Sequence, residues 1–282
     1  MITIQQALYY GGKELNQKGI RCPFLESRIF LRDIVGISER DLITNRESRI
    51  TNDDFQKFEK AIARRKKFEP VAYITNKKEF WRDIFYVNES TLIPRPDSEL
   101  IIETILKHIP NDNINLKFLD LGTGSGCLII SVLKEYKFSS GIGIDIDINA
   151  VKVAQKNKNI LKNKKRLEFR LSDFSYFNTS IFDVIICNPP YVDRSEINNL
   201  QMEITSYEPH QAIFADEKGT NYYSKIITNL KKNYKCDQKI FFEIGIYQSE
   251  FLCNLLKNND FTVLEVAKDI SGIPRCIAAK RN

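Results

Sequence analysis

The chain has 282 residues, of which 43% are hydrophobic and 28% are charged, so it is long enough for two domains and is not mainly disordered. The N-terminal sequence lacks the basic start and apolar block of a signal peptide, and no apolar run has the length of a membrane span. We therefore expect a cytoplasmic protein with no membrane association. The net charge of +6 is compatible with an acidic partner, but lysine is abundant in every part of the chain, so the charge by itself defines no binding surface.

Cysteine and histidine usage argues against disulfides and metal ions. The six cysteines are scattered and form no C-x-x-C pair, which indicates reduced thiols. Only His108 and His210 are present, far apart and without acidic partners at ligand spacing. Because zinc sites are built from clusters of such side chains, we expect no metal.

Residues 1–70 show helical periodicity and no convincing strand. Pro23 stands at a permitted first-turn position of one predicted helix, and Thr51 and Asp54 have the spacing of a capping box at the start of another. The sequence therefore predicts a small helical bundle over this segment.

Residues 71–96 differ in composition from the segment before them. They are rich in aromatic and β-branched residues and are interrupted by the polar stretch "TNKK". This pattern predicts a β-hairpin that links two domains. After Pro96, Asp97 or Ser98 is expected to cap a helix, since both side chains accept hydrogen bonds from helix N-termini.

From residue 116 onward, predicted strands and helices alternate, beginning with "LKFLDLG", "CLIISVLKEY" and "SGIGIDI". Parallel strands need crossover helices, so this alternation predicts an α/β fold with a mainly parallel sheet and helices on both faces. Only the short stretch "KDISGIP" separates the last two predicted strands, "FTVLEVA" and "RCIAAK". This pair is therefore expected to be antiparallel.

A glycine-rich loop, "DLGTGSG", lies between the first strand and helix of this region. Gly122, Gly124 and Gly126 let the backbone approach a ligand at the carboxyl edge of the sheet, where doubly wound folds bind ligands. Asp145 ends the next predicted strand and can accept both hydroxyls of a ribose. The alternative for the loop alone is a tight turn, and the acidic residue favours a nucleotide-like cofactor instead.

Either NAD or S-adenosylmethionine would present a ribose to Asp145. The loop has the spacing G-x-G-x-G and not the G-x-G-x-x-G of dinucleotide-binding folds. Asp120, just before the loop, would repel a pyrophosphate but suits a sulfonium or an ammonium group. At the end of the third strand, Asp173 is placed to accept from an adenine amino group while Phe174 packs on the ring; for Asp173 alone, a helix cap is an equal alternative. Together these residues resemble the S-adenosylmethionine-dependent methyltransferases of the Rossmann-like class.

The stretch "NPPY" follows the fourth predicted strand. An adenine amino group or a carboxamide is a poor nucleophile because its lone pair is delocalised. The Asn188 side-chain oxygen and the Pro189 carbonyl can accept both N–H bonds of such a group and direct its lone pair toward a methyl donor. Pro190 helps to fix the backbone and Tyr191 offers a flat face. A strand-ending turn is the alternative. The motif therefore favours methylation of a planar NH2 group, but it does not distinguish glutamine from adenine.

Further segments resemble one family, the peptide chain release factor glutamine methyltransferases (HemK/PrmC-like). The resemblance covers nearly the whole chain and includes "LIPRPDSE", "FLDLGTGSGCL", "FDVIICNPPYV" and "FFEIG". It implies a seven-stranded class I methyltransferase sheet with an antiparallel last strand over residues 97–282, preceded by the 71–96 hairpin linker and by a helical substrate-recognition domain at 1–70. The chain departs from the family pattern at Asn76, where a glycine is usual, and at Ser98, where threonine is frequent.

The resemblance also implies the ligands and the site residues. S-adenosyl-L-methionine would be the cofactor, S-adenosyl-L-homocysteine the product, and the glutamine of the Gly-Gly-Gln motif of class-1 release factors the methyl acceptor. The protein would be a monomer with no stable nucleic-acid complex. Cofactor contacts would fall on Gly122, Thr123, Gly124, Ser125, Gly126, Asp145, Asp173, Phe174 and Asn188. Substrate contacts would fall on Asn188, Pro189, Pro190 and Tyr191, with Asn188, Pro189 and Tyr191 as the catalytic residues.

Three residues near these motifs have two interpretations each. Arg95 and Glu99 either contact the substrate or form a local ion pair, and Glu208 is either a turn residue or a substrate contact. The alternative functions are an adenine methyltransferase acting on DNA or RNA and an RNA-binding module with a vestigial methyltransferase fold. The first would need a groove for a flipped base and a dedicated nucleic-acid-binding domain, and residues 1–70 contain no recognisable motif of that kind.

Overall fold

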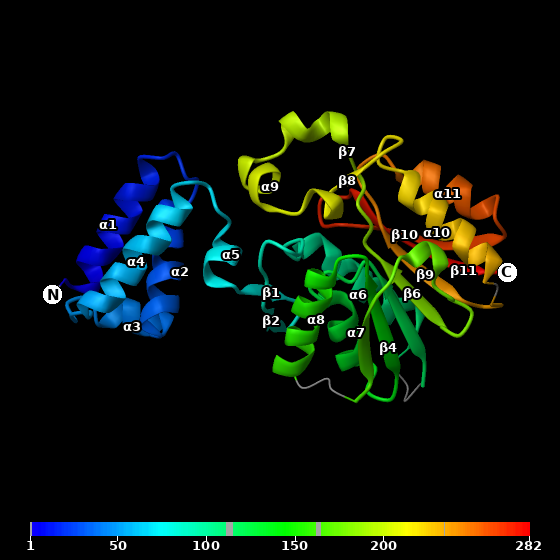
Figure 1. Cartoon of the computed structure of the whole chain (residues 1–282), viewed down its shortest axis with the longest axis horizontal. Helices are drawn as coiled ribbons and strands as arrows, with labels where there is room; N and C mark the ends of the chain where they lie inside the picture. Colours follow the sequence, from blue (N-terminus) through cyan, green and yellow to red (C-terminus); the bar gives the residue numbers. More distant parts are fainter. Residues whose placement is uncertain (1, 111–114, 162–164, 234) are drawn as a thin grey trace. The chain divides into compact units, whose positions relative to one another are not determined.

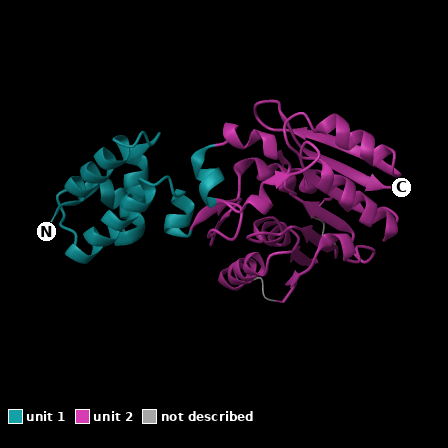
Figure 2. Ribbon diagram, turned by 45° about the horizontal axis from the view of Figure 1, so that its top comes forward, with its two compact units in different colours: residues 1–76, 201–207 teal, residues 77–200, 208–282 magenta. Residues whose placement is uncertain are grey.

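The computed structural model describes residues 2–110, 115–161, 165–233 and 235–282. The chain divides into two compact units, which are coloured separately in Figure 2. Unit 1 comprises Met1–Asn76 and Gln201–Tyr207, and unit 2 comprises Lys77–Leu200 and Glu208–Asn282. A short segment from the second half of the sequence therefore belongs to the N-terminal unit.

Unit 1 is helical, as predicted (Figure 1). Pro23 is the first residue of its helix, and the Thr51 hydroxyl accepts a hydrogen bond from the Asp54 amide at 3.1 Å, so both predicted helix starts are confirmed. Buried side chains such as Phe30 and Phe58 form its core. The helices of this unit are α1 (Ile4–Asn16), α2 (Pro23–Val35), α3 (Glu39–Thr44), α4 (Asn52–Arg65), α5 (Val71–Thr75) and α9 (Met202–Tyr207).

The predicted hairpin is present but lies further along the chain than expected. Its strands are β1 (Lys78–Phe80) and β2 (Asp83–Phe85), so Trp81 forms part of the turn and the expectation of a turn at "TNKK" is wrong. Residues 71–75 are α5, because Val71 and Ile74 lie on one helical face and pack against the core of unit 1. Tertiary packing thus overrides the strand preference of these residues. Asn76 ends α5 in the left-handed conformation that asparagine tolerates, with φ 54°.

The sheet of unit 2 has seven strands in the order β10-β11-β9-β6-β3-β4-β5, which confirms the predicted fold class. Neighbouring strands from β9 to β5 are parallel, and β11 is antiparallel to both β9 and β10. The strands are β3 (Lys117–Leu121), β4 (Ser140–Asp145), β5 (Leu167–Leu171), β6 (Val184–Cys187), β9 (Lys239–Glu243), β10 (Phe261–Lys268) and β11 (Pro274–Arg281). A separate parallel pair, β7 (Val192–Asp193) and β8 (Phe214–Ala215), was not predicted.

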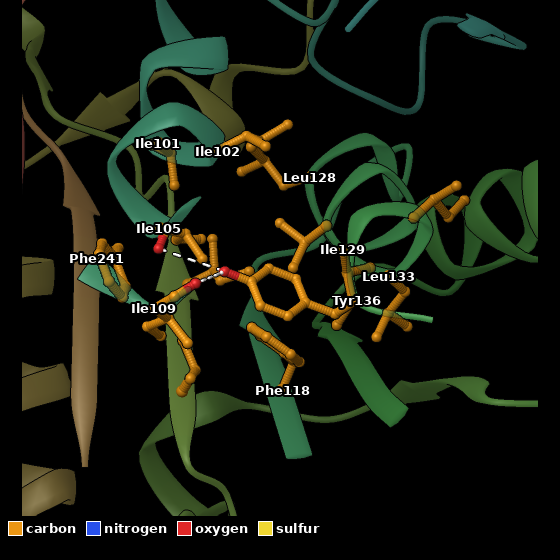
Figure 3. Packing of buried hydrophobic residues seen from close by; sticks show 14 of the residues in the cluster. Ile101, Ile102, Ile105, Ile109, Phe118, Leu128, Ile129, Leu133, Tyr136 and Phe241 are labelled. Carbon is orange, nitrogen blue, oxygen red and sulfur yellow. Dashed lines mark hydrogen bonds between the residues drawn. The ribbon is translucent and has the colours of Figure 1, made fainter. Parts of the chain in front are cut away.

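Helices cover both faces of this sheet. Successive residues of a strand face opposite sides, so neighbouring residues of one strand belong to different cores. In β6, Ile186 belongs to the core shared with α6, α7 and α8, whereas Ile185 belongs to the core shared with α10 and α11. Figure 3 shows part of the first core, where the buried Tyr136 hydroxyl donates a hydrogen bond to the Ile109 carbonyl. The helices are α6 (Glu99–His108), α7 (Cys127–Glu135), α8 (Ile148–Ile160), α10 (Asn221–Lys232) and α11 (Ser249–Lys257).

The start of α6 differs from the prediction. A 3-10 turn over Pro96–Ser98 precedes the helix, and Ser98 occupies the N-cap position without a capping hydrogen bond from its side chain. The expectation that Asp97 or Ser98 caps this helix is therefore wrong: the Asp97 carboxylate lies 3.3 Å from Arg275, and the Ser98 hydroxyl is engaged elsewhere. Across the described residues, no helix combines the length and apolar character required to cross a bilayer.

Candidate active site

A cavity of about 370 Å³ opens at the carboxyl edge of the parallel strands in unit 2. Its volume lies in the range of small-molecule sites. The glycine loop and the ends of β4, β5 and β6 form one part of its wall, and residues 90–98 and 209–225 form the rest. Of the predicted site residues, those lining it are Arg95, Gly122, Thr123, Gly124, Ser125, Asp145, Asp173, Phe174, Asn188 and Pro190.

The glycine loop has the backbone conformation that its composition predicts. Gly122, Gly124 and Gly126 all have positive φ, at 71°, 54° and 79°. A Cβ atom added to Gly122 or Gly124 would meet no atom within 4 Å, so these two residues leave open space. At Gly126 the same atom would lie 2.8 Å from the Phe169 ring. Gly126 is buried and does not line the cavity. A side chain at this position would collide with the packed helix and strand, so Gly126 is needed for packing and not for approach of a ligand.

Asp145 orders the loop as well as facing the cavity. One carboxylate oxygen accepts from the Gly124 amide at 2.9 Å and the other from the Asp147 amide at 3.0 Å. Burial raises the pKa of this carboxyl, and the two amide hydrogen bonds oppose that rise. Each oxygen keeps a second lone pair for a ribose hydroxyl. Asp147, the competing acidic residue, also lines the cavity, and its side chain caps α8 by accepting from Asn149 at 2.8 Å.

Asp173 and Phe174 lie at the end of β5 and both line the cavity. Asp173 Oδ1 accepts from the Ser175 amide at 2.7 Å and caps a 3-10 turn, so the helix-cap interpretation is confirmed. The Phe174 ring meets Tyr222 edge-to-face at a centroid distance of 6.0 Å. This pair gives the cavity an aromatic wall next to a carboxylate, an arrangement that suits a purine ring.

Asn188 reaches the cavity from the end of β6. Its side-chain Nδ2 donates to Ser98 Oγ at 3.2 Å. This bond leaves the Asn188 Oδ1 atom as the side-chain acceptor for a ligand. Pro190 also lines the cavity, but Pro189 is buried and Tyr191 is half-buried, and both lie outside the lining.

Tyr191 is held from behind by Glu243. The Tyr191 hydroxyl donates to Glu243 Oε1 at 2.9 Å, and burial together with this negative charge raises the pKa of Tyr191. Its backbone carbonyl accepts from Gln248 Nε2 at 2.9 Å. The expected flat face toward a substrate is therefore not exposed in the cavity as described.

The three residues with two interpretations are now distinguished. Arg95 lines the cavity and forms an ion pair with the buried Glu208, whose other oxygen accepts from the Ile93 amide at 3.0 Å. Glu208 is therefore an anchor of the cavity wall. Glu99 lies outside the lining, and its carboxylate accepts from the Trp81 amide at 2.7 Å, which stabilises the hairpin turn. The structure thus gives Glu99 a local contact within unit 2, and its contact with a substrate stays a prediction.

Asp120 lies beneath the glycine loop and not in the cavity wall. It is 1% exposed, and its Oδ2 accepts from the Thr123 hydroxyl at 2.6 Å. Burial raises its pKa to about 7, and the charge of Asp145 adds to this rise. Asp120 therefore acts on a ligand only through Thr123 and through its charge.

The sequence did not reveal every residue of the site. Ser98 was assigned to a helix cap, and Glu243 was noted only within the family segment "FFEIG". The available signal was a glutamate directly after the apolar stretch "IFF", since carboxylates are almost never fully buried unless they are paired. Other lining residues, including Leu92, Gln211, Tyr222 and Lys225, were not predicted as site residues.

The residues present fit S-adenosylmethionine. Asp145 is placed at the cavity wall to hold a ribose, Phe174 and Tyr222 form an aromatic wall, and the open space at Gly122 and Gly124 admits close approach of a ligand. Asp145 and, when it is ionised, Asp120 place negative charge near this wall, which favours a cationic ligand over a pyrophosphate.

Comparisons with known proteins agree with this geometry. Residues 97–207 match the methyltransferase small domain, and residues 6–75 match the PrmC N-terminal domain. The crystal structure of the hMettl16 catalytic domain in complex with MAT2A 3'UTR hairpin 6 aligns with a TM-score of 0.56 at 14% identity, covering 81% of each chain, which shows a shared fold. The fold and the site together place the chain in the class of Rossmann-like class I methyltransferases.

Curated relatives identify the family within this class. The bifunctional methyltransferase of Rickettsia typhi is 36% identical over 98% of this chain, which spans only 57% of the length of that relative. The release factor glutamine methyltransferase of Koribacter versatilis is 31% identical, and the match covers 99% of both chains. The chain therefore belongs to the release factor glutamine methyltransferase family.

Proposed function

We propose that this protein transfers a methyl group from S-adenosyl-L-methionine to the side-chain amide nitrogen (N5) of the glutamine in the Gly-Gly-Gln motif of class-1 release factors, with S-adenosyl-L-homocysteine as the product. The observation that carries the proposal is the placement of Asn188: its Nδ2 is held by Ser98, and its Oδ1 remains an acceptor in a cavity that fits the methyl donor. The family membership of the chain supports glutamine as the acceptor.

The proposed chemistry requires few groups from the protein. The bound cofactor supplies an electrophilic methyl group on its sulfonium. Asn188 Oδ1 and the Pro189 carbonyl accept the two N–H bonds of the glutamine amide and localise its lone pair, while the proline rings fix this backbone. The methyl group would pass from the sulfonium to the amide nitrogen as the S–C bond breaks, and the methylated nitrogen would lose its proton to water. Asp145 would hold the ribose hydroxyls, and Phe174 and Asp173 would lie next to the adenine.

The partner proposals follow from the same function. We assign release factor recognition to the helical bundle of residues 1–70 and transfer to residues 97–282, and we expect a monomer without a stable nucleic-acid complex. We propose the cytoplasm as the location because release factors act there and because all six cysteines are free thiols.

Incubation with labelled S-adenosylmethionine tests the proposal. The acceptors are a class-1 release factor, the same factor with its Gly-Gly-Gln glutamine replaced, and DNA or RNA. We expect label only in the intact release factor. Label confined to nucleic acid would instead establish the adenine methyltransferase alternative.

The Asn188→Ala variant tests the assigned role of the amide. It removes one acceptor for the target nitrogen, so transfer should fall by about 100-fold or more while S-adenosylhomocysteine still binds. Asn198→Ala provides the matched control, because Asn198 is an exposed asparagine of the 3-10 helix Arg194–Asn199 that follows. Turnover of Asn188→Ala equal to that of Asn198→Ala would contradict the role given to Asn188.

A further inference from the structure

Glu243 is a buried acid behind the candidate active site. It is the last residue of β9 and follows the buried apolar stretch "IFF". Only 2% of the Glu243 surface is exposed. Its Oε1 accepts from the Tyr191 hydroxyl at 2.9 Å. Its Oε2 is inaccessible and, among the described residues, has no donor that meets ordinary hydrogen-bond geometry. A buried carboxylate oxygen in this state costs free energy unless a nearby donor turns toward it.

The Ser98 hydroxyl is available as that donor. Its hydroxyl makes no capping bond to α6 and accepts from Asn188 Nδ2 at 3.2 Å, so its single proton is not used by the helix or by Asn188. The hydroxyl lies close enough to Glu243 for hydrogen bonding to lower the pKa of the carboxyl, although burial raises that pKa more strongly. Ser98 is therefore bonded to Asn188 on the cavity side, and a turn of its hydroxyl proton toward Glu243 would connect Asn188 to the buried strand end.

The direction of the hydrogen bonds along this line decides which atom of Asn188 faces the substrate. An ionised Glu243 only accepts. A Ser98 hydroxyl that donates to this carboxylate is able to accept from Asn188 but not to donate to it. Asn188 must then turn its NH2 group toward Ser98 and its oxygen toward the cavity. With the opposite direction, Ser98 would donate to Asn188 Oδ1, and the Asn188 NH2 group would face the NH2 group of the substrate and repel it.

We propose that Glu243 is a positioning residue that fixes this direction through Ser98, so that Asn188 presents its oxygen to the nitrogen that is methylated. The proposal rests on the proposed function for the identity of that nitrogen. The same carboxylate holds the Tyr191 hydroxyl, so Glu243 connects the first and last residues of "NPPY". Gln248 supports the arrangement by donating to the Tyr191 carbonyl at 2.9 Å.

Kinetics of single-residue variants test the proposal. Glu243→Gln has the same shape but offers an NH2 group, and Ser98→Ala removes only one oxygen atom. Both should lower kcat for release factor methylation by about 100-fold, because the Asn188 amide loses its preferred orientation. The dissociation constant of S-adenosylhomocysteine should stay close to the wild-type value. Ser98→Thr keeps the hydroxyl and should retain most of the activity, and Glu168→Gln, an exposed glutamate on β5, is the matched control.

A measurement on the Asn188 amide makes the test independent of catalysis. In protein labelled with ¹⁵N-asparagine, the Asn188 side-chain NH2 signals are assigned by their loss in Asn188→Ala. They should shift in Ser98→Ala and Glu243→Gln but not in Glu168→Gln. Unchanged signals, or unchanged kcat in both variants, would overturn the proposal. If the wild-type protein methylates no release factor, the proposed function fails, whereas the NH2 signals still report whether Glu243 orients Asn188.

Discussion

Replacement of Asp145 by alanine gives a sharp test of the cofactor site. Asp145 has two tasks: it accepts from the amides of Gly124 and Asp147, and it faces the cavity. The first task concerns the free protein and the second concerns ligand binding. A ribose contact therefore predicts an effect on cofactor affinity much larger than the effect on the stability of the free protein.

The magnitude follows from the hydrogen bonds involved. A hydrogen bond to a charged acceptor contributes about 1.5–3 kcal/mol, so loss of two ribose hydroxyl contacts costs about 3 kcal/mol or more. This corresponds to a dissociation constant weakened by roughly 100-fold. In the free protein, losing the two amide bonds is partly offset, because burial of the Asp145 carboxylate is itself unfavourable and raises its pKa. The melting temperature should therefore change little.

Calorimetric titration with S-adenosylhomocysteine measures the affinity, and thermal unfolding measures the stability. Asp147→Asn is the matched control, because Asp147 also lines the cavity and asparagine keeps the cap of α8. Its dissociation constant should remain near the wild-type value. Equal affinity of Asp145→Ala and wild type would refute the ribose contact, and a larger loss in Asp147→Asn would transfer that contact to Asp147.

Three further predictions concern stability. Burial raises the pKa of Asp120 from 3.8 to about 7, so between these pH values the folded protein holds a proton that the unfolded chain has released. The free energy of unfolding therefore falls as pH rises from about 4 to about 7. In urea unfolding, the free energy of unfolding of Asp120→Asn should exceed that of wild type by at most about 4 kcal/mol at pH 8 and by much less at pH 5. Gly219→Ala should lower both the melting temperature and kcat, because Gly219 has φ 79° and a Cβ there would lie 2.0 Å from the Tyr191 carbonyl oxygen; an unchanged melting temperature would contradict this packing. Arg65 is 4% exposed and binds Glu203 at 2.6 Å within unit 1, so Arg65→Ala should destabilise by about 3–5 kcal/mol in chemical denaturation, and a loss below about 1 kcal/mol would contradict a buried ion pair.

The fold was predictable because its signals are local and repeated. Most strands of the parallel region contain a short apolar run, such as "FDVII", and β3 and β4 are each followed directly by an α-helix. The antiparallel end of the sheet followed from a connection too short for a crossover helix. The position of the hairpin was not predictable, because Val71 and Ile74 have strand preference and only their packing in unit 1 makes them helical.

The site was predictable only where a residue follows a strand. Asp145, Asp173 and Asn188 each end a parallel strand or follow it directly, so strand assignment alone brings them to one edge of the sheet. The same rule gave no means of separating Arg95, which lines the cavity, from Glu99, which stabilises the hairpin. These two residues lie four positions apart. The side of a helix start that faces a cavity depends on tertiary packing and cannot be predicted from the local sequence.

The preference for a cationic cofactor arises from burial as much as from loop spacing. Asp120, Asp145 and Glu243 end or lie near the ends of β3, β4 and β9, and burial raises the pKa of all three. Each is nevertheless held by donors that favour its charged form: Thr123 for Asp120, two backbone amides for Asp145 and Tyr191 for Glu243. When they are ionised, these buried carboxylates make this edge of the sheet negative. A positively charged sulfonium would offset the unfavourable free energy of these buried negative charges, and a pyrophosphate would increase it. Carboxylates that mostly lie behind the cavity wall therefore favour S-adenosylmethionine over a dinucleotide.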